Sequence, residues 1–391
     1  MVITDVAGID DVDEREFAWF KLRAFQDTEW AADHLCRLHM LPTSARPNAR
    51  RMAEQVRVCL LQAQEYFEAA RHATLATRPV LLYYGMMSFA IAEVLVKQDG
   101  ESRIERLREK HNAHGLKLSV DGKIDSTVPL KDLGLRLHAL PQTNSAGRFG
   151  TFEVWRRSVR ESPVPAKFTG IYPAAGGSQS GPRVAFKGTD VEQAHLPDSG
   201  HSLLSALRVL PQLEATLAQF NLNASLIRAT LNMEIHFGAD GSKSGRLQMI
   251  VHPGPPGFCD AFCSRIKFRA EAVNLLQIAE LPNGIILTVP IQGDEERELI
   301  RQLPPAVTLR DKFSHFCVDD WSLGEGGAFY IALHICGNLA RYYPEIWMRH
   351  IERASQLCMV VERLCEVALR RVPLLAAMEL HRVYIRRDQL T

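Results

Sequence analysis

The sequence has almost no net charge and no concentration of cysteine, and each absence excludes a class of protein. Its 391 residues hold 46 Lys and Arg against 45 Asp and Glu, which gives a formal net charge of +1. A protein that binds nucleic acid over its whole surface carries a large cationic excess, so that class is excluded. Eight cysteines in a chain of this length are too few for the dense framework of a small disulfide scaffold.

The common catalytic and phosphate-binding motifs are missing as well. The sequence contains no GxSxG, no HExxH, no GxxxxGK followed by Ser or Thr, and no strand–GxGxxG–helix unit. The segment DDWSLGEGGAF places two carboxylates before a glycine-rich turn, where a helix N-terminus could bind an anion. We favour the alternative that Asp319 and Asp320 are turn and cap residues.

A metal site has weak support. Cys259 and Cys263 follow His252, but their CxxxC spacing is not the usual zinc spacing, and no second pair of ligands is near. Buried free thiols are the favoured interpretation. A metal-dependent enzyme that uses these three residues remains an alternative, and the prediction is that the protein holds no metal and no cofactor.

The sequence has no segment typical of export or of a membrane span. Its first residues (MVITDVAGIDDVDERE) lack the features of a signal peptide, so we expect a cytoplasmic protein with reduced cysteines. The longest apolar stretch, residues 79–96, is shorter than the about 20 residues that span a membrane, and it contains Ser88 and Glu93. We therefore predict a buried core helix and no membrane partner.

The N-terminal part of the chain has the periodicity of helices. Apolar residues at helical spacing predict helices over residues 16–40 and 49–71, the second capped by Asn48. Pro79 suits the first turn of a third helix, and a short charged helix is expected over residues 102–110.

The remaining pattern predicts short strands and then helices. Strands are expected at 116–120 and 183–188, with a flexible loop at 170–182 and a helix at 202–220 that is split at Pro211. Further strands are expected at 225–237, 246–252 and 285–290, with a hairpin turn at Asp240-Gly241 and a last strand within 307–318. Two helices then follow at 328–343 and 345–371, separated at Pro344 and ended by Pro373. The predicted class is α+β, with N- and C-terminal helical segments packed together and a mixed, mainly antiparallel β insert between them. The expected domains are residues 1–115, 116–325 and 326–391.

Three motifs carry a family resemblance. They are LLYYGMMSFAIAEVL (81–95), HGLKLS (114–119) and LARYYPEIW (339–347). Together they resemble the YaaC-like family, a group of bacterial proteins without an established biochemical activity. The resemblance extends over most of the chain and is weakest over about 120–200.

The N-terminal motifs also have a more distant likeness. A Tyr-Tyr helix, a charged helix and a His-Gly turn resemble the helical HEPN superfamily, whose members are RNases of toxins and phage defence or non-catalytic binding modules. Active members carry an Arg and a His that are separated by four to six residues. The RNA's own 2′-hydroxyl attacks the phosphate, His moves a proton and Arg stabilises the charge, without a metal. The resemblance implies Arg106, Arg108, His111 and His114 as catalytic residues.

Spacing alone does not support that assignment. Four Arg–His pairs have the required separation: two within residues 106–114, one at Arg246 and His252, and one at Arg310 and His315. With 35 Arg and 14 His in 391 residues, about as many pairs are expected by chance. The Glu residues between these basic groups also fit a solvated helix face.

A second set of residues predicts a binding surface. Arg341 and Tyr342 lie with Trp347 around Pro344, where a cation among aromatic rings can stack on a base. The structural alternative is a cation–π contact that holds two helices. Tyr84 and Gly115 complete the predicted binding residues.

The two resemblances imply a cytoplasmic, YaaC-like and HEPN-like protein that binds RNA or a nucleotide in bacterial defence or a stress response, with metal-independent RNA cleavage as its activity if it is an enzyme. We also expect a homo-oligomer, in which dimerisation completes the site. The alternative is a non-catalytic regulatory protein that docks a protein partner through its aromatic helices. Burial of the histidines with Tyr84 and Arg341 in an apolar core would favour this alternative.

Overall fold

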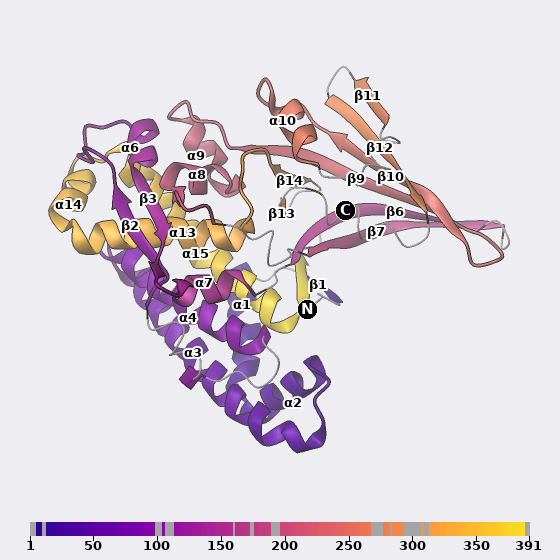
Figure 1. The fold of residues 1–391 in the computed structure, drawn as a ribbon, viewed down its shortest axis with the longest axis horizontal. Helices are drawn as coiled ribbons and strands as arrows, with labels where there is room; N and C mark the ends of the chain where they lie inside the picture. Colours follow the sequence, from indigo (N-terminus) through magenta and orange to yellow (C-terminus); the bar gives the residue numbers. More distant parts are fainter. Residues whose placement is uncertain are drawn as a thin grey trace.

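A large group of helices forms one side of the molecule, and a long mixed sheet extends from it (Figure 1). The computed structural model describes residues 5–9, 13–97, 104–105, 113–158, 161–172, 176–188, 196–266, 277–281, 284–292, 303, 306–308 and 313–387. The predicted α+β class is confirmed, with helices at both ends of the chain and a mainly antiparallel sheet between them.

The N-terminal helices are shorter or longer than their periodicity predicts. They are α1 (Glu14–Arg23), α2 (Thr28–Leu38), α3 (Arg46–His72) and α4 (Arg78–Lys97), with 3-10 turns η1 (Ala24–Gln26) and η2 (Thr43–Ala45) between them. The single helix predicted over residues 16–40 is wrong, because the carboxylate of Asp27 accepts two backbone N–H groups and starts a new helix. The Asn48 cap is also wrong, since α3 already begins at Arg46.

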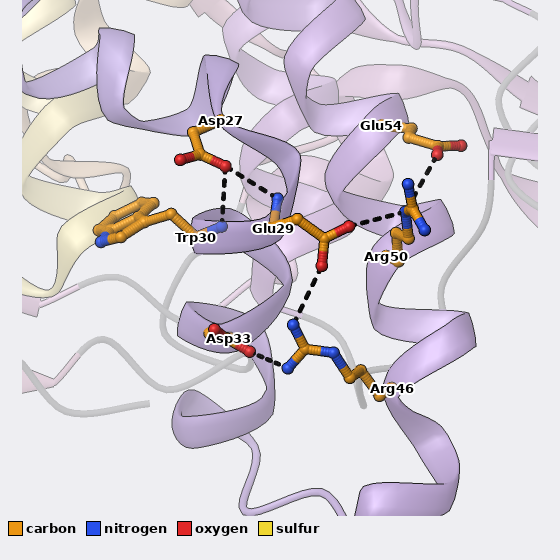
Figure 2. A network of polar contacts seen from close by, with 7 residues as sticks. All are labelled: Asp27, Glu29, Trp30, Asp33, Arg46, Arg50 and Glu54. Carbon is orange, nitrogen blue, oxygen red and sulfur yellow. Dashed lines mark hydrogen bonds and ion pairs between the residues drawn. The ribbon is translucent and has the colours of Figure 1, made fainter.

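An exposed network of charges ties α2 to α3 (Figure 2). The guanidinium of Arg46 bonds to Glu29 at 3.0 Å and also to Asp33, and Arg50 lies 3.0 Å from the other oxygen of Glu29. These side chains are largely in water, so the network contributes little to stability.

Helix α4 is the core helix that the sequence predicts. It is long and apolar enough to cross a membrane by length and composition, but 72% of its apolar window is buried inside the protein. It packs against α3, against α13 (Gly324–Tyr342) and against α15 (Gln356–His381). Pro79 lies in its first turn as expected. Burial among helices from both ends of the chain accounts for its apolar surface.

Small elements connect these helices to the sheet. They are β2 (Leu116–Val120), α6 (Leu130–Arg136), β3 (Leu137–Pro141), β4 (Thr143–Asn144), β5 (Gly147–Arg148), α7 (Thr151–Arg156), β8 (His201–Ser202), α8 (Leu203–Arg208), η4 (Pro211–Leu213) and α9 (Glu214–Ala218). Strands β2, β3 and β8 form a small sheet. The helix predicted over 202–220 is split at Pro211, as expected.

The large sheet is centred on β9 (Leu226–Phe237). Its other strands are β6 (Glu161–Tyr172), β7 (Gly177–Gly188), β10 (Lys243–Val251), β11 (Gln277–Leu281), β12 (Gly284–Gln292), β13 (Ala306–Thr308) and β14 (Ser314–Cys317). The β9–β10 hairpin turns at Asp240-Gly241 as predicted, with Gly241 at a φ of +82°. The segment 307–318 holds parts of two strands rather than one.

The flexible loop predicted over residues 170–182 is wrong. These residues lie mainly in β6 and β7, which pair in register with Thr169 opposite Ser180. Residues 177–180 are exposed, and β7 pairs only with β6 within the described chain. An exposed edge strand needs no apolar face, so the polar, glycine-rich sequence gives no alternation that would identify it.

The C-terminal helices break at two positions, of which the sequence predicts one. Helix α13 is followed by α14 (Pro344–Glu352) and α15, and the predicted break at Pro344 is confirmed. A second break at Ala354, with a φ of +45°, was not predicted, and Ser355 caps α15 there. The prediction that Pro373 ends the helix is wrong, because buried contacts on both sides of Pro373 hold α15 together across it.

The described residues form two apolar cores. The larger core spans residues from Ala18 to Leu380 and includes side chains of the small central helices. The smaller core lies on the large sheet and includes Met249 and Phe262 of α10 (Phe258–Arg265). The two ends of the chain meet in a parallel pair, β1 (Asp5–Ile9) with β15 (Val383–Arg387). The predicted domain division at residues 115 and 325 stays a prediction.

Candidate functional site: a histidine, arginine and tyrosine cluster

A glycine turn fixes the backbone at His114. Gly115 has a φ of +84°, and a side chain there would press against Phe152 and Gly150. Its backbone N–H donates to the side-chain oxygen of Gln142 at 2.9 Å, and the carbonyl of His114 accepts from Phe152 at 3.1 Å. Gly115 therefore positions the chain, and the prediction that it contacts a ligand gains no support.

Helices α4 and α13 bring the other members of the cluster together. A side chain at Gly337 would lie 3.2 Å from the Cβ atom of Tyr83, so this glycine allows the two helices to pack closely. Arg341, one turn further along α13, therefore reaches Tyr84 on α4. Its guanidinium donates a hydrogen bond to the Tyr84 hydroxyl.

Aromatic rings surround this cation. The guanidinium carbon of Arg341 lies 6.0 Å from the Tyr84 ring centre and 5.1 Å from that of Tyr342. Tyr84 also stacks on Tyr66 of α3, with centroids 5.7 Å apart and planes at 26°. Arg341 is exposed and Tyr342 is 58% exposed, so the cluster reaches the surface.

The ring of His114 lies at the inner side of this cluster. Its centroid is 5.6 Å from that of Tyr83 and 6.2 Å from that of Tyr84, and its Nδ1 is 3.1 Å from the sulfur of Met87. Partial burial lowers the pKa of His114, and the positive charge of Arg341 lowers it further. His114 is therefore mainly neutral at pH 7 and able to accept a proton.

Behind His114 lie three buried polar side chains, Tyr83, Tyr330 and His334, with exposed fractions of 3%, 0% and 1%. Burial, and then the charge of His114, lowers the pKa of His334 to about 3. Burial likewise raises the pKa of both tyrosines. All three side chains are uncharged at neutral pH.

The structure brings together part of the predicted set. His114, Tyr84, Arg341 and Tyr342, which come from three separate motifs, form one cluster. Trp347 does not join it: the indole is 1% exposed, and its N–H donates to the carbonyl of Leu75 at 3.1 Å. This burial favours the structural alternative, in which Trp347 belongs to the core. The predicted catalytic residues Arg106, Arg108 and His111 lie outside the described residues.

Tyr66 and the buried polar residues Tyr83, Tyr330 and His334 are members of the site that no motif indicates. His334 carries a usable signal, because it is the one histidine within the apolar run of α13. Tyr83 adjoins Tyr84, but only the packing of α4 shows that one phenol faces the core while the other faces the surface.

The other candidate sites contain mainly structural contacts. Cys259 and Cys263 are half-buried thiols, burial raises the pKa of both, and the described residues contain no group of three metal-ligating side chains. All eight cysteines are free thiols. Asp319 accepts a hydrogen bond from Ser225 and lies 3.4 Å from Arg208, which agrees with its predicted place in a turn.

The fold and the cluster define an α+β protein with a cationic, aromatic surface site between its first and last helical segments. Comparison with protein families assigns a relationship to part of the chain: residues 23–130 match the family described as YaaC-like Protein. The matched span runs from the end of α1 to the start of α6 and includes Tyr84 and His114. The predicted resemblance is thus confirmed over this span. No curated protein and no solved structure matches the chain.

Proposed function

We propose that this YaaC-like protein binds RNA or a nucleotide at the cluster of His114, Tyr84, Arg341 and Tyr342, as a cytoplasmic component of bacterial defence or stress response. One observation carries the proposal: an exposed arginine is held between two tyrosine rings beside a neutral histidine.

Each member of the cluster matches one part of such a ligand. The planar guanidinium of Arg341 can bind two phosphate oxygens at once. The ring of Tyr342 is open enough for a base to stack on it, and stacking accepts any base. The Tyr84 hydroxyl holds the guanidinium in place before the ligand arrives, which reduces the entropy lost on binding.

The same arrangement supports RNA cleavage without a metal. Neutral His114 would take the proton from a 2′-hydroxyl as its oxygen attacks the neighbouring phosphorus. Arg341 would stabilise the extra negative charge. The bond to the 5′-oxygen would break as that oxygen takes a proton from a water molecule, and His114 would then release its own proton to the resulting hydroxide. The products are a 2′,3′-cyclic phosphate and a free 5′-hydroxyl. That Arg106, Arg108 and His111 contribute remains a prediction.

Labelled RNA incubated with the purified protein in EDTA tests the activity. We expect cleavage that falls at least a hundredfold in Arg341→Gln and in the double variant His111→Ala, His114→Ala, because one transition-state contact contributes about that much. Arg349→Gln is the matched control, since Arg349 is exposed on the neighbouring helix α14. Equal cleavage by all these proteins would show that the cluster is not catalytic.

Binding without cleavage is measured separately by the change in fluorescence anisotropy of the same RNA. If the wild type binds the RNA without cleaving it, and Arg341→Gln no longer binds it, the non-catalytic form of the proposal is supported. Neither binding nor cleavage would favour docking of a protein partner, for which Tyr342 and the 40% exposed Met348 offer apolar surface.

A further inference from the structure

Three buried polar side chains meet between α4 and α13 without satisfying all their hydrogen bonds. The hydroxyls of Tyr83 and Tyr330 and the Nε2 atom of His334 have no hydrogen-bond partner among the residues that the structure describes. Leaving a buried donor or acceptor unpaired costs free energy, and folded proteins rarely do so. Phenylalanine would fill the space of either tyrosine without that cost, so packing alone does not explain the hydroxyls.

The three side chains are neighbours. The ring of Tyr83 lies 6.0 Å from that of Tyr330 and 5.2 Å from that of His334, measured between centroids. Tyr330 and His334 are one turn apart on α13, so they share a face of that helix. We refer to these three residues as the buried polar trio. Because it stands on two packed helices, its geometry is fixed before any ligand binds.

The hydrogen bonds of His334 determine which ring nitrogen carries the proton. The amide nitrogen of Asn338 lies 2.7 Å from the carbonyl oxygen of His334, so this atom is a donor. The same nitrogen lies 3.1 Å from Nδ1 of His334, which must then accept. In the neutral ring the proton is therefore on Nε2. The trio thus offers one fixed N–H donor and two hydroxyls that can donate or accept.

The surface cluster carries a positive charge, whereas the buried polar trio is polar but uncharged. Arg341 at the surface suits an anion, whereas the trio is uncharged at pH 7 and suits a neutral group with hydrogen-bonding atoms. His114 lies between them, with its ring 5.6 Å from that of Tyr83. A nucleotide has this same division, because its phosphate is charged and the edge of its base is a neutral array of donors and acceptors.

We propose that the buried polar trio binds the hydrogen-bonding edge of a nucleobase whose phosphate lies on Arg341, and so selects among bases. The inference rests on the proposed function and adds its specificity. A carbonyl on the base would accept from Nε2 of His334. For the base to reach the trio the ring of His114 would have to turn away from Met87, a contact that is weak because a thioether sulfur is a poor acceptor.

Calorimetric titration of the full-length protein tests this inference. The ligands are the four ribonucleosides, their 5′-monophosphates and inorganic phosphate. We expect one base to be preferred, and we expect Tyr83→Phe and Tyr330→Phe each to weaken that nucleoside about fivefold while phosphate binding stays unchanged. Arg341→Gln should weaken the monophosphates and phosphate but not the nucleosides. Tyr172→Phe, at the far end of β6, is the matched control.

The arms of the experiment separate the two proposals. One outcome is that phosphate and the monophosphates bind through Arg341 while neither Phe variant changes the preference among bases. That result would overturn the role of the trio and leave the proposed function intact. If phosphate, the monophosphates and RNA all fail to bind, the proposed function is wrong. If the nucleosides also give no binding heat, the trio has no role in binding a base either. A clearly lower melting temperature of Tyr83→Phe or Tyr330→Phe would show that its hydroxyl is already paired, which also overturns the inference.

Discussion

Two histidines connect the first helices to the last one. The Nε2 atom of His34 lies 3.0 Å from the carbonyl oxygen of Leu380, and that of His381 lies 2.8 Å from the carbonyl oxygen of Lys21. A carbonyl can only accept, so each Nε2 carries a proton and each neutral ring keeps Nδ1 unprotonated. Burial is the main cause that lowers the pKa of both rings, for His381 to about 4.

These histidines make the protein less stable in acid. For His381 the pKa is 6.5 in the unfolded chain and about 4 in the folded protein, so between these pH values only the unfolded chain binds the proton. Stability is therefore complete above the unfolded pKa and falls as the pH drops through this window. The measurement is the free energy of unfolding in urea at about pH 7 and at about pH 4.5. We expect His381 to account for about 1–2 kcal/mol of the difference between the two values, a figure already reduced for its partial exposure.

The variant His381→Gln isolates this contribution. Glutamine keeps an N–H donor for the carbonyl of Lys21 but cannot take up a proton, so the variant should lose less stability between the two pH values than the wild type. The same loss in both proteins would show that His381 does not titrate as described.

The candidate site was predicted in part. Tyr84, His114 and Arg341 lie in separate motifs. They meet because α4 packs against α13 and the Gly115 turn places His114 beside both helices, which composition does not reveal. Trp347 was chosen for the same chemistry and is buried. On a helix as short as α14 the sequence does not show which face the neighbouring helices cover, so an aromatic residue there fits both interpretations.

Among the elements, α13 and α15 are joined by a buried ion pair. The guanidinium of Arg371 bonds to both carboxylate oxygens of Glu325 at 2.7 and 2.8 Å, and Gln212 of η4 donates to the same carboxylate at 2.7 Å. The side chains are only 14% and 7% exposed. This geometry is the bidentate one that makes Arg–carboxylate pairs strong.

Removing one partner of this pair should be more costly than removing both. Arg371→Met leaves the Glu325 carboxylate buried without its cation and should cost about 3–5 kcal/mol, whereas the double variant Glu325→Leu, Arg371→Met should recover most of that loss. The measurement is the free energy of unfolding in urea.

A matched control is Arg46→Met in the exposed network of Figure 2. Its effect should be much smaller and should shrink further in salt, because water already screens those charges. Equal losses at the two sites, or a double variant no better than Arg371→Met alone, would contradict this account of the buried pair.

Sequence patterns located most helices and the central hairpin, and they failed at specific boundaries. The break at Asp27 is a local capping signal that the longer helical periodicity concealed. Pro373 illustrates the reverse, because packing on both sides of α15 overrides a residue that usually ends a helix. Residues 177–180 of the edge strand β7 are exposed and polar, so they show no alternation that would identify a strand.

At the scale of the whole molecule, the separate core of the sheet predicts two cooperative units. Met249 is fully buried in the sheet core and Leu333 in the helical core. Replacing either by alanine should cost about 2–5 kcal/mol within its own unit. Native-state hydrogen exchange should then show faster exchange in β9, β10 and β12 for Met249→Ala and in α4 and α13 for Leu333→Ala. Faster exchange throughout the chain in both variants would instead mean that the two cores unfold as one.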